Sequence, residues 1–201
     1  MLARRGVGSA PCFVENKEKR GEKKIKTEYL LDREVDMVLR ALTPENRRVM
    51  QVCLHTGLRV SDVLSLRTEQ IKPRFWVTEA KTGKRRLIGL PAALREELLD
   101  NAGEVWVFEH RTDPAKHRSR QAVWKDVKRA AKLFRIPQNV APHSFRKVYA
   151  VDLLNECGDI GKVQKALNHG SMETTMIYAA AAQLLAAKKQ TKAARVGKRL
   201  R

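Results

Sequence analysis

The stretch Thr56-Gly57-Leu58-Arg59-Val60-Ser61-Asp62 carries the strongest signal of fold in this chain. The segment before it opens with Thr43-Pro44, and proline suits the first position of a helix. Gly57 then predicts the end of that helix, because glycine readily adopts the left-handed backbone of a helix C-terminus. A short helix is expected over 61–66. Arg59 therefore lies on a turn between two helices, which aims its guanidinium at one point.

Apolar periodicity on both sides of this stretch predicts a mainly α domain with a small antiparallel β-sheet, of the α+β class. One helix is expected from an N-cap at Thr27 to Leu42. Two β-type segments, 75–79 and 86–90, flank Lys81-Thr82-Gly83-Lys84 and predict a hairpin. A buried strand or an apolar plug is expected over 105–108. Further helices are expected over 91–99, 119–134, 142–157, 160–167 and 171–187.

The chain has 201 residues, which is room for one substantial core. Residues 1–26 are polar and basic without apolar periodicity, as is typical of a flexible arm. Residues 27–187 are expected to form the folded domain. Residues 188–201 are a basic tail that is either solvated or in contact with DNA.

The charge selects a class of partner. Lys and Arg number 41 against 22 acidic residues, giving a formal net charge of +19. Such a field attracts polyanions, and nucleic acid is the usual one. A ribosomal or RNA-coating protein would be equally basic, so the charge indicates no reaction.

Other classes of protein are disfavoured. Cys12, Cys53 and Cys157 lie far apart, which argues against both a disulfide framework and a structural zinc site. No metal and no other cofactor is expected. No apolar run approaches the roughly 20 residues that span a bilayer, and no apolar segment follows Arg4 and Arg5 as in a signal peptide. We therefore expect a cytoplasmic protein without a membrane partner.

Besides the stretch 56–62, three further short motifs, here called boxes, carry side chains that can take part in catalysis. Lys81 stands at the hairpin turn. His143 and Arg146 follow Pro142 and share one helix face at a spacing of i and i+3. The last box holds Leu167-Asn168-His169-Gly170-Ser171 and, about two turns into the helix that Ser171 caps, Tyr178.

In their order, these boxes resemble the tyrosine recombinase family, also called phage integrases. That family carries Thr-Gly-Leu-Arg, a hairpin lysine, His-x-x-Arg, a Leu-x-His element and a tyrosine nine residues later. Each box alone is weakly specific, whereas the ordered set is strongly so, and the match covers residues 27–187. The resemblance implies the tyrosine recombinase catalytic-domain fold and a site of six residues: Arg59, Lys81, His143, Arg146, His169 and Tyr178.

The resemblance also implies a site-specific DNA recombinase. Tyr178 would attack a DNA phosphorus and form a covalent 3′-phosphotyrosine, and a freed 5′ hydroxyl would later attack that link. Arg59 and Arg146 would stabilise charge on the nonbridging oxygens, with a further hydrogen bond from His169. Lys81 would protonate the leaving 5′ oxygen, and His143 would accept the tyrosine proton. Because one ester replaces another, no ATP is required, and the resemblance also implies a reaction without a metal.

Each of these residues also has an alternative, non-catalytic interpretation. An arginine in so basic a chain is usually a surface residue or a phosphate contact. His143 could cap its helix, and Tyr178 could be a packing aromatic. Lys84 is a close rival of Lys81 as the proton donor. Tyr149, on the helix of the His-Arg pair, could pack in the core.

The chain departs from the family pattern in places. Asn168 replaces a usual glycine, Lys147 stands where a histidine is frequent, and the expected acid after the first arginine is present as Asp62. The basic segment 1–26 is too short to form the helical core-binding domain that most members carry N-terminally. The chain therefore resembles short members such as fimbrial phase-switch invertases and minimal phage integrases, or is a fragment of a longer protein.

The resemblance implies double-stranded DNA as partner, bound by a homo-tetramer on paired sites. Without DNA, the protein would be a monomer or a weak oligomer. Accessory DNA-bending proteins are a further expectation. The apolar segment 179–185 would dock on a neighbouring subunit or pack within its own. Two alternatives remain open: a type IB topoisomerase-like relaxing enzyme, and a non-catalytic DNA-binding accessory protein. The choice among integration, excision, inversion and resolution also stays open.

Overall fold

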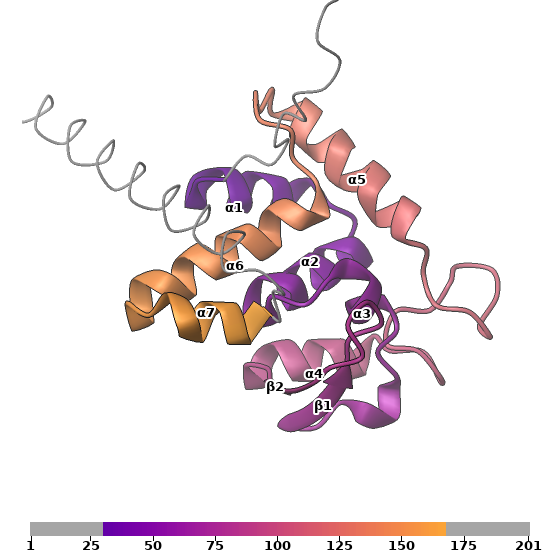
Figure 1. Ribbon diagram of the computed structural model, residues 1–201. Helices are drawn as coiled ribbons and strands as arrows, with labels where there is room; N and C mark the ends of the chain where they lie inside the picture. The colour runs from indigo at the N-terminus through magenta and orange to yellow at the C-terminus, as the bar shows by residue number, and fades with distance from the viewer. Residues whose placement is uncertain (1–29, 168–201) are drawn as a thin grey trace, which may run out of the picture.

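The structure, a computed structural model, describes residues 30–167. It is mainly helical with one two-stranded antiparallel sheet, which confirms the predicted class. The elements in chain order are α1 Asp32–Ala41, α2 Pro44–Thr56, α3 Val60–Leu64, the short 3-10 helix η1 Thr68–Gln70, β1 Arg74–Thr78, β2 Arg85–Gly89, α4 Ala92–Asp100, α5 Arg120–Leu133, α6 Pro142–Cys157 and α7 Ile160–Leu167 (Figure 1).

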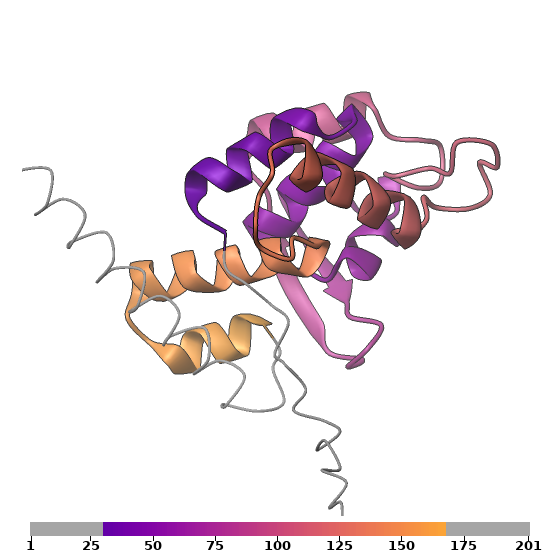
Figure 2. The same ribbon diagram turned by 90° about the horizontal axis from the view of Figure 1, so that it is seen from above.

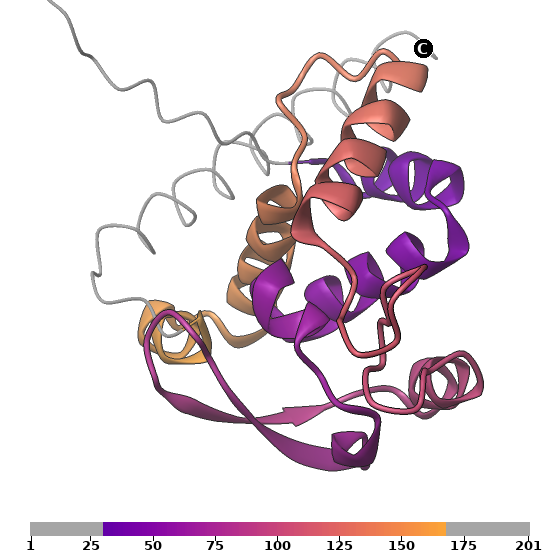
Figure 3. The same ribbon diagram turned by 90° about the vertical axis from the view of Figure 1, so that its right-hand side faces the viewer.

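Helix α2 lies at the centre of the arrangement. It packs on α1, α3, α5 and α6. Helix α1 lies on one side of α2, and the β1–β2 hairpin lies with α4 on the other (Figures 1 and 3). Helices α6 and α7 run side by side at one edge of the domain (Figure 2). The main apolar core joins these elements through buried side chains that include Val38, Met50, Phe75, Ile88, Leu98, Val127 and Phe145. A smaller cluster of Ala150, Val163 and Leu167 holds α7 against α6.

Local signals place the elements that carry the predicted site. Helix α2 begins at Pro44 and ends before Gly57, whose φ of 64° is left-handed, as predicted. Helix α6 likewise begins at Pro142 and ends before a left-handed glycine, Gly158. Ser119 caps α5 by accepting a hydrogen bond from the Ala122 amide at 3.1 Å. These three predicted helices are confirmed to within a residue.

The hairpin is confirmed with its strands one residue earlier than predicted. Phe75 pairs with Ile88 across the ladder, and both side chains are buried. Burial alternates along β1, so Trp76 faces solvent between buried Phe75 and Val77. By the same alternation Glu79, two residues after Val77, is also buried.

Some predicted boundaries are wrong. A helix capped at Thr27 would include residues 30 and 31, but Leu31 is extended with φ −73° and ψ 152°. The Glu34 carboxylate accepts a hydrogen bond from the Leu31 amide at 2.8 Å, which starts the helix at Asp32 instead. The helices predicted over 61–66 and 91–99 span Val60–Leu64 and Ala92–Asp100. Thr27 and the predicted helix 171–187 lie outside the described residues.

The segment 105–108 forms the predicted apolar plug and no named strand. Its backbone makes one isolated bridge, between Trp106 and Arg67. Val107 and Phe108 are buried in the main core, whereas Val105 is exposed. Packing of these side chains therefore fixes the segment without an extended ladder.

Candidate active site

The Thr56–Asp62 stretch forms the floor of the site. After α2 ends, Gly57 reverses the chain, and Arg59 takes an extended backbone at the start of α3. The ring of Tyr149 on α6 covers Gly57 so closely that a Cβ atom there would lie 2.3 Å from the ring. A residue without a side chain is therefore required at position 57 both by its conformation and by its neighbour.

Two carboxylates from different elements hold the Arg59 guanidinium. Glu79, which follows β1, accepts a short hydrogen bond from Arg59 Nη1. Asp62 Oδ2 lies 3.9 Å from the same nitrogen, and its other oxygen accepts a hydrogen bond from the Ala80 amide at 3.1 Å. Burial raises the pKa of Asp62, and the nearby Glu79 raises it further. The Arg59 side chain is 22% exposed, so part of it remains accessible to a ligand.

Arg146, on the second turn of α6, is only 2% exposed and binds two backbone carbonyls. Its Nη1 donates to Gly57 O at 2.6 Å, and its Nη2 donates to Leu167 O at the end of α7. One guanidinium thus joins α6, the Gly57 turn and the end of α7.

His143 stands one turn before Arg146 and faces the same pocket. The imidazole pKa is lowered to about 4 by partial burial and by the positive charges of Lys147, Arg146, Arg59 and Lys81. The ring is therefore neutral at neutral pH and can accept a proton. Lys147, which stands where the family often has histidine, is buried and contributes to this shift.

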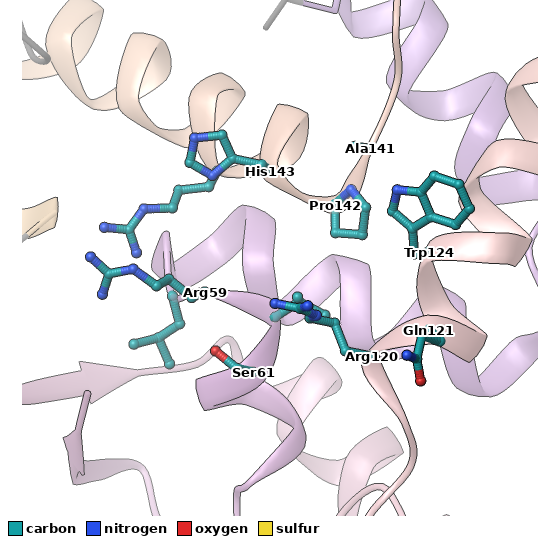
Figure 4. Close-up of a pocket in the computed structure, with 11 residues that line it drawn as sticks. Arg59, Ser61, Arg120, Gln121, Trp124, Ala141, Pro142 and His143 are labelled. Carbon is teal, nitrogen blue, oxygen red and sulfur yellow. The ribbon is translucent and has the colours of Figure 1, made fainter. Parts of the chain in front are cut away.

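Arg59, His143 and Arg146 line one pocket of about 440 Å³. Its apolar lining includes Leu58, Val60 and Pro142, and its far wall comes from α5. Figure 4 shows the Arg59 and His143 side chains on one side of this pocket and Arg120, Gln121 and Trp124 on the other. Trp124 is 48% exposed although it is a large apolar side chain. The pocket therefore combines cationic groups that suit an anion with an exposed aromatic surface beside them.

Lys81 lies in the exposed turn of the hairpin. The amides of Thr82 and Gly83 both donate to Glu79 O, at 3.2 and 2.8 Å, which fixes this turn. The charge of Lys81 contributes to the low pKa of His143. Lys84 closes the hairpin through its backbone, since its carbonyl accepts from the Glu79 amide at 3.0 Å.

His169 and Tyr178 lie outside the described residues. Of the other four predicted side chains, Arg59, His143 and Arg146 line one pocket, and Lys81 lies in the exposed hairpin turn. Tyr149, the tyrosine on the helix of the His-Arg pair, is partly buried against the smaller cluster. Its pKa is raised, first by burial. Tyr149 therefore packs against the core, as predicted.

Two further residues of the site, Glu79 and Arg86, were not indicated by any of the sequence motifs. Glu79 is fully buried and Arg86 contacts both Glu79, at 3.3 Å, and Thr56 O, at 2.8 Å. The available signal was the alternation of β1, because Glu79 follows Phe75 and Val77 at a spacing of two and so shares their inward face. A charged residue at such a position requires a buried partner.

Within residues 30–167, no group of three or more histidine, cysteine, aspartate or glutamate side chains is arranged to hold a metal ion. None of the helices in that range combines the length and apolar composition that a bilayer crossing needs.

Comparison with known proteins identifies the family. Residues 28–184 match the profile of the phage integrase family. The integrase of Escherichia phage P2 is 28% identical over 176 residues, covering 85% of this chain and 49% of that protein. The tyrosine recombinase of Thermosipho africanus is 31% identical over 163 residues, covering 75% of this chain and 56% of that protein. This chain belongs to the phage integrase family, the tyrosine recombinases, and spans about half the length of these curated relatives.

Solved structures confirm the fold. The catalytic domain of bacteriophage HP1 integrase superimposes with a TM-score of 0.57 at 22% identity, covering 81% of this chain and 94% of that domain. A lambda integrase tetramer bound to a Holliday junction gives a TM-score of 0.65 at 19% identity, covering 80% of this chain and 50% of that chain. The described residues therefore have the tyrosine recombinase catalytic-domain fold.

Proposed function

We propose that this chain is the catalytic part of a site-specific DNA recombinase that cleaves and rejoins strands through a 3′-phosphotyrosine at Tyr178. The observation that carries the proposal is the convergence of Arg59, His143 and Arg146 on one pocket. Arg59 and Arg146 stand 87 positions apart in the sequence, and each is held by contacts outside its own helix. Family membership makes DNA the expected anion for this pocket.

The two guanidinium groups would act on the nonbridging oxygens of the scissile phosphate. Arg59 is partly exposed, and Arg146 lines the same pocket. Both are held before substrate arrives, so they stabilise the charge of the transition state without reorganising. His169 would add a further hydrogen bond to one of these oxygens.

Proton transfer is assigned to His143 and Lys81. As the Tyr178 oxygen bonds to phosphorus, neutral His143 would accept the phenolic proton. The bond from phosphorus to the 5′ oxygen breaks at the same centre, and Lys81 would protonate that oxygen. The reverse transfers would reseal the strand when a 5′ hydroxyl attacks the tyrosyl link, so no ATP is consumed.

The end of α7 favours the participation of His169. Arg146 binds the carbonyl of Leu167, and consecutive Cα atoms are about 3.8 Å apart, so two residues reach at most about 8 Å. His169 follows Leu167 by two residues and Tyr178 follows it by eleven, and both lie outside the described residues.

Double-stranded DNA is the proposed partner, with a homo-tetramer on paired sites as the working assembly. The net charge of +19 supports DNA binding that weakens steeply as salt rises. The lambda integrase with this fold was solved as a tetramer on a Holliday junction. Integration, excision and inversion are equally compatible with the pocket described above.

Covalent capture tests the proposal. The full chain is incubated with a pool of duplexes that carry one nick and randomised flanking sequence, so that cleavage releases a short fragment and traps the enzyme. We expect a DNA adduct that survives denaturation, and sequencing the captured DNA gives the preferred site. Tyr178→Phe should abolish the adduct while DNA binding persists, whereas the matched control Tyr149→Phe should retain it.

An adduct in Tyr178→Phe would place the nucleophile elsewhere, and absence of any adduct from the wild-type chain would overturn the proposal in favour of a non-catalytic DNA-binding protein. A plasmid relaxation assay distinguishes a recombinase from a type IB topoisomerase-like enzyme. A recombinase should join two copies of the captured site and relax plasmids poorly. Efficient relaxation without joining would indicate a type IB topoisomerase-like enzyme.

A further inference from the structure

Glu79 has a set of contacts that no catalytic step described above uses. Its side chain is fully buried at the first residue after β1, in a chain whose formal net charge is +19. Burying a carboxylate is costly unless charged or polar partners surround it. The partners of Glu79 therefore indicate what this carboxylate is placed to hold.

Each oxygen of Glu79 binds a different part of the site. Oε2 accepts from Arg59 Nη1 and, at 3.2 Å, from the hydroxyl of Thr82 beside Lys81. Oε1 accepts from Arg86 Nη1 at 3.3 Å. One side chain thus contacts the first arginine of the pocket, the lysine-bearing turn and a second arginine.

Arg86 extends these contacts toward Arg146. Its Nη2 donates to the Thr56 carbonyl at 2.8 Å, and the next carbonyl, of Gly57, accepts from Arg146 at 2.6 Å. Two consecutive carbonyls at the end of α2 are thus each held by one guanidinium. The backbone of Glu79 adds to this arrangement by accepting from the amides of Thr82 and Gly83.

We infer that Glu79 is a positioning residue that fixes the Arg59 guanidinium for the scissile phosphate and links it, through Arg86, to the backbone that Arg146 binds. The inference rests on the proposed function and assigns Glu79 no contact with DNA. Arg59 also lies near Asp62, but at 3.9 Å, and Asp62 Oδ2 has no hydrogen-bond partner. The closer and fully buried Glu79 is therefore the group that sets the direction of the guanidinium.

The test is a double-mutant cycle on covalent adduct formation. It uses the full chain and the nicked duplex selected from the randomised pool, with rates normalised to folded protein. Glu79→Gln keeps the size of the side chain but removes its charge. Because a displacement of about 1 Å in a positioned group lowers rates by up to about 100-fold, we expect a 10- to 100-fold slower adduct, with the Kd for DNA changed less than threefold. In an Arg59→Ala background, the same substitution should change the residual rate less than threefold.

Asp126→Asn is the matched control. Asp126 is also a buried carboxylate, bound by Asn46 at 2.7 Å and by Arg129 at 2.7 Å, but it lies outside the pocket. We expect Asp126→Asn to lower thermal stability, as Glu79→Gln does, and to leave the rate of adduct formation per folded molecule unchanged. If Glu79→Gln does not fold, Glu79→Asp retains the charge and withdraws it from Arg59, and it should show the same selective loss of rate.

The outcomes separate this inference from the proposed function. If the wild-type chain forms the adduct and Glu79→Gln forms it equally fast per folded molecule, Glu79 is structural only and the inference is overturned. The same conclusion follows if Glu79→Gln slows the reaction as much in the Arg59→Ala background as in the wild type. If the wild-type chain forms no adduct, the proposed function itself fails.

Discussion

Substitution of Gly57 by alanine tests the packing that supports the arginine pair. Gly57 and Gly158 both end helices at a φ of 64°, but their surroundings differ. A Cβ atom at Gly57 would lie 2.3 and 2.5 Å from two ring carbons of Tyr149, whereas a Cβ atom at Gly158 would meet nothing within 4 Å. Gly158→Ala therefore measures the cost of conformation alone, and Gly57→Ala adds the clash.

The magnitudes follow from these two terms. A left-handed backbone costs a residue with a Cβ atom about 1–2 kcal/mol, and this term is common to both variants. Overpacking in a close-packed region adds about 1–3 kcal/mol. We expect Gly57→Ala to lower the free energy of unfolding by about 1–3 kcal/mol more than Gly158→Ala does. The displaced Gly57 carbonyl should also loosen its bond to Arg146, so adduct formation should slow only in Gly57→Ala.

Urea unfolding of both variants provides the measurement, with the midpoint shifted and the m-value retained. Adding Tyr149→Ala to Gly57→Ala removes the ring that the Cβ atom meets. The penalty for alanine at position 57 should then fall to that at position 158. Equal destabilisation by Gly57→Ala and Gly158→Ala in the presence of Tyr149 would refute the argument that this ring restricts position 57.

Two further predictions concern titratable groups. The imidazole of His143 should titrate in an NMR experiment near pH 4, assigned by the signal lost in His143→Gln. Because this pKa lies below the unfolded value of about 6.5, the unfolded state binds more protons between these pH values. The stability advantage of wild type over His143→Gln should therefore shrink as pH falls from 6.5 to 4, and a midpoint above pH 6 would contradict the assignment. Burial raises the pKa of the Cys53 thiol to about 12, so this thiol should resist a thiolate-selective reagent at pH 8 until the protein unfolds, whereas Cys157, which is partly exposed, should react in the folded state. Mass mapping of labelled peptides checks this order, and equal labelling of both thiols in the folded protein would exclude it.

The sequence determined those features that a few neighbouring residues encode. Helix α2 begins at Pro44 and ends before Gly57, and α6 begins at Pro142. Proline restricts the backbone at its own position, whereas glycine allows the left-handed conformation that ends a helix. Alternation predicted the hairpin, although its strands lie one residue earlier than predicted. The first helix began later than predicted because Glu34 caps it at Leu31, a competing local signal. The order of the family boxes likewise indicated the family without any structure.

Only the tertiary structure decided which side chains meet. Sequence spacing alone cannot place Arg146 against the carbonyls of Gly57 and Leu167, because these residues are brought together by the packing of α2, α6 and α7. The same holds for Glu79 between Arg59 and Arg86, where the strand pattern predicts an inward side chain but not its partners. The physical reason is the range of the forces: caps and turns depend on adjacent backbone, whereas a buried ion pair depends on the whole core that closes around it.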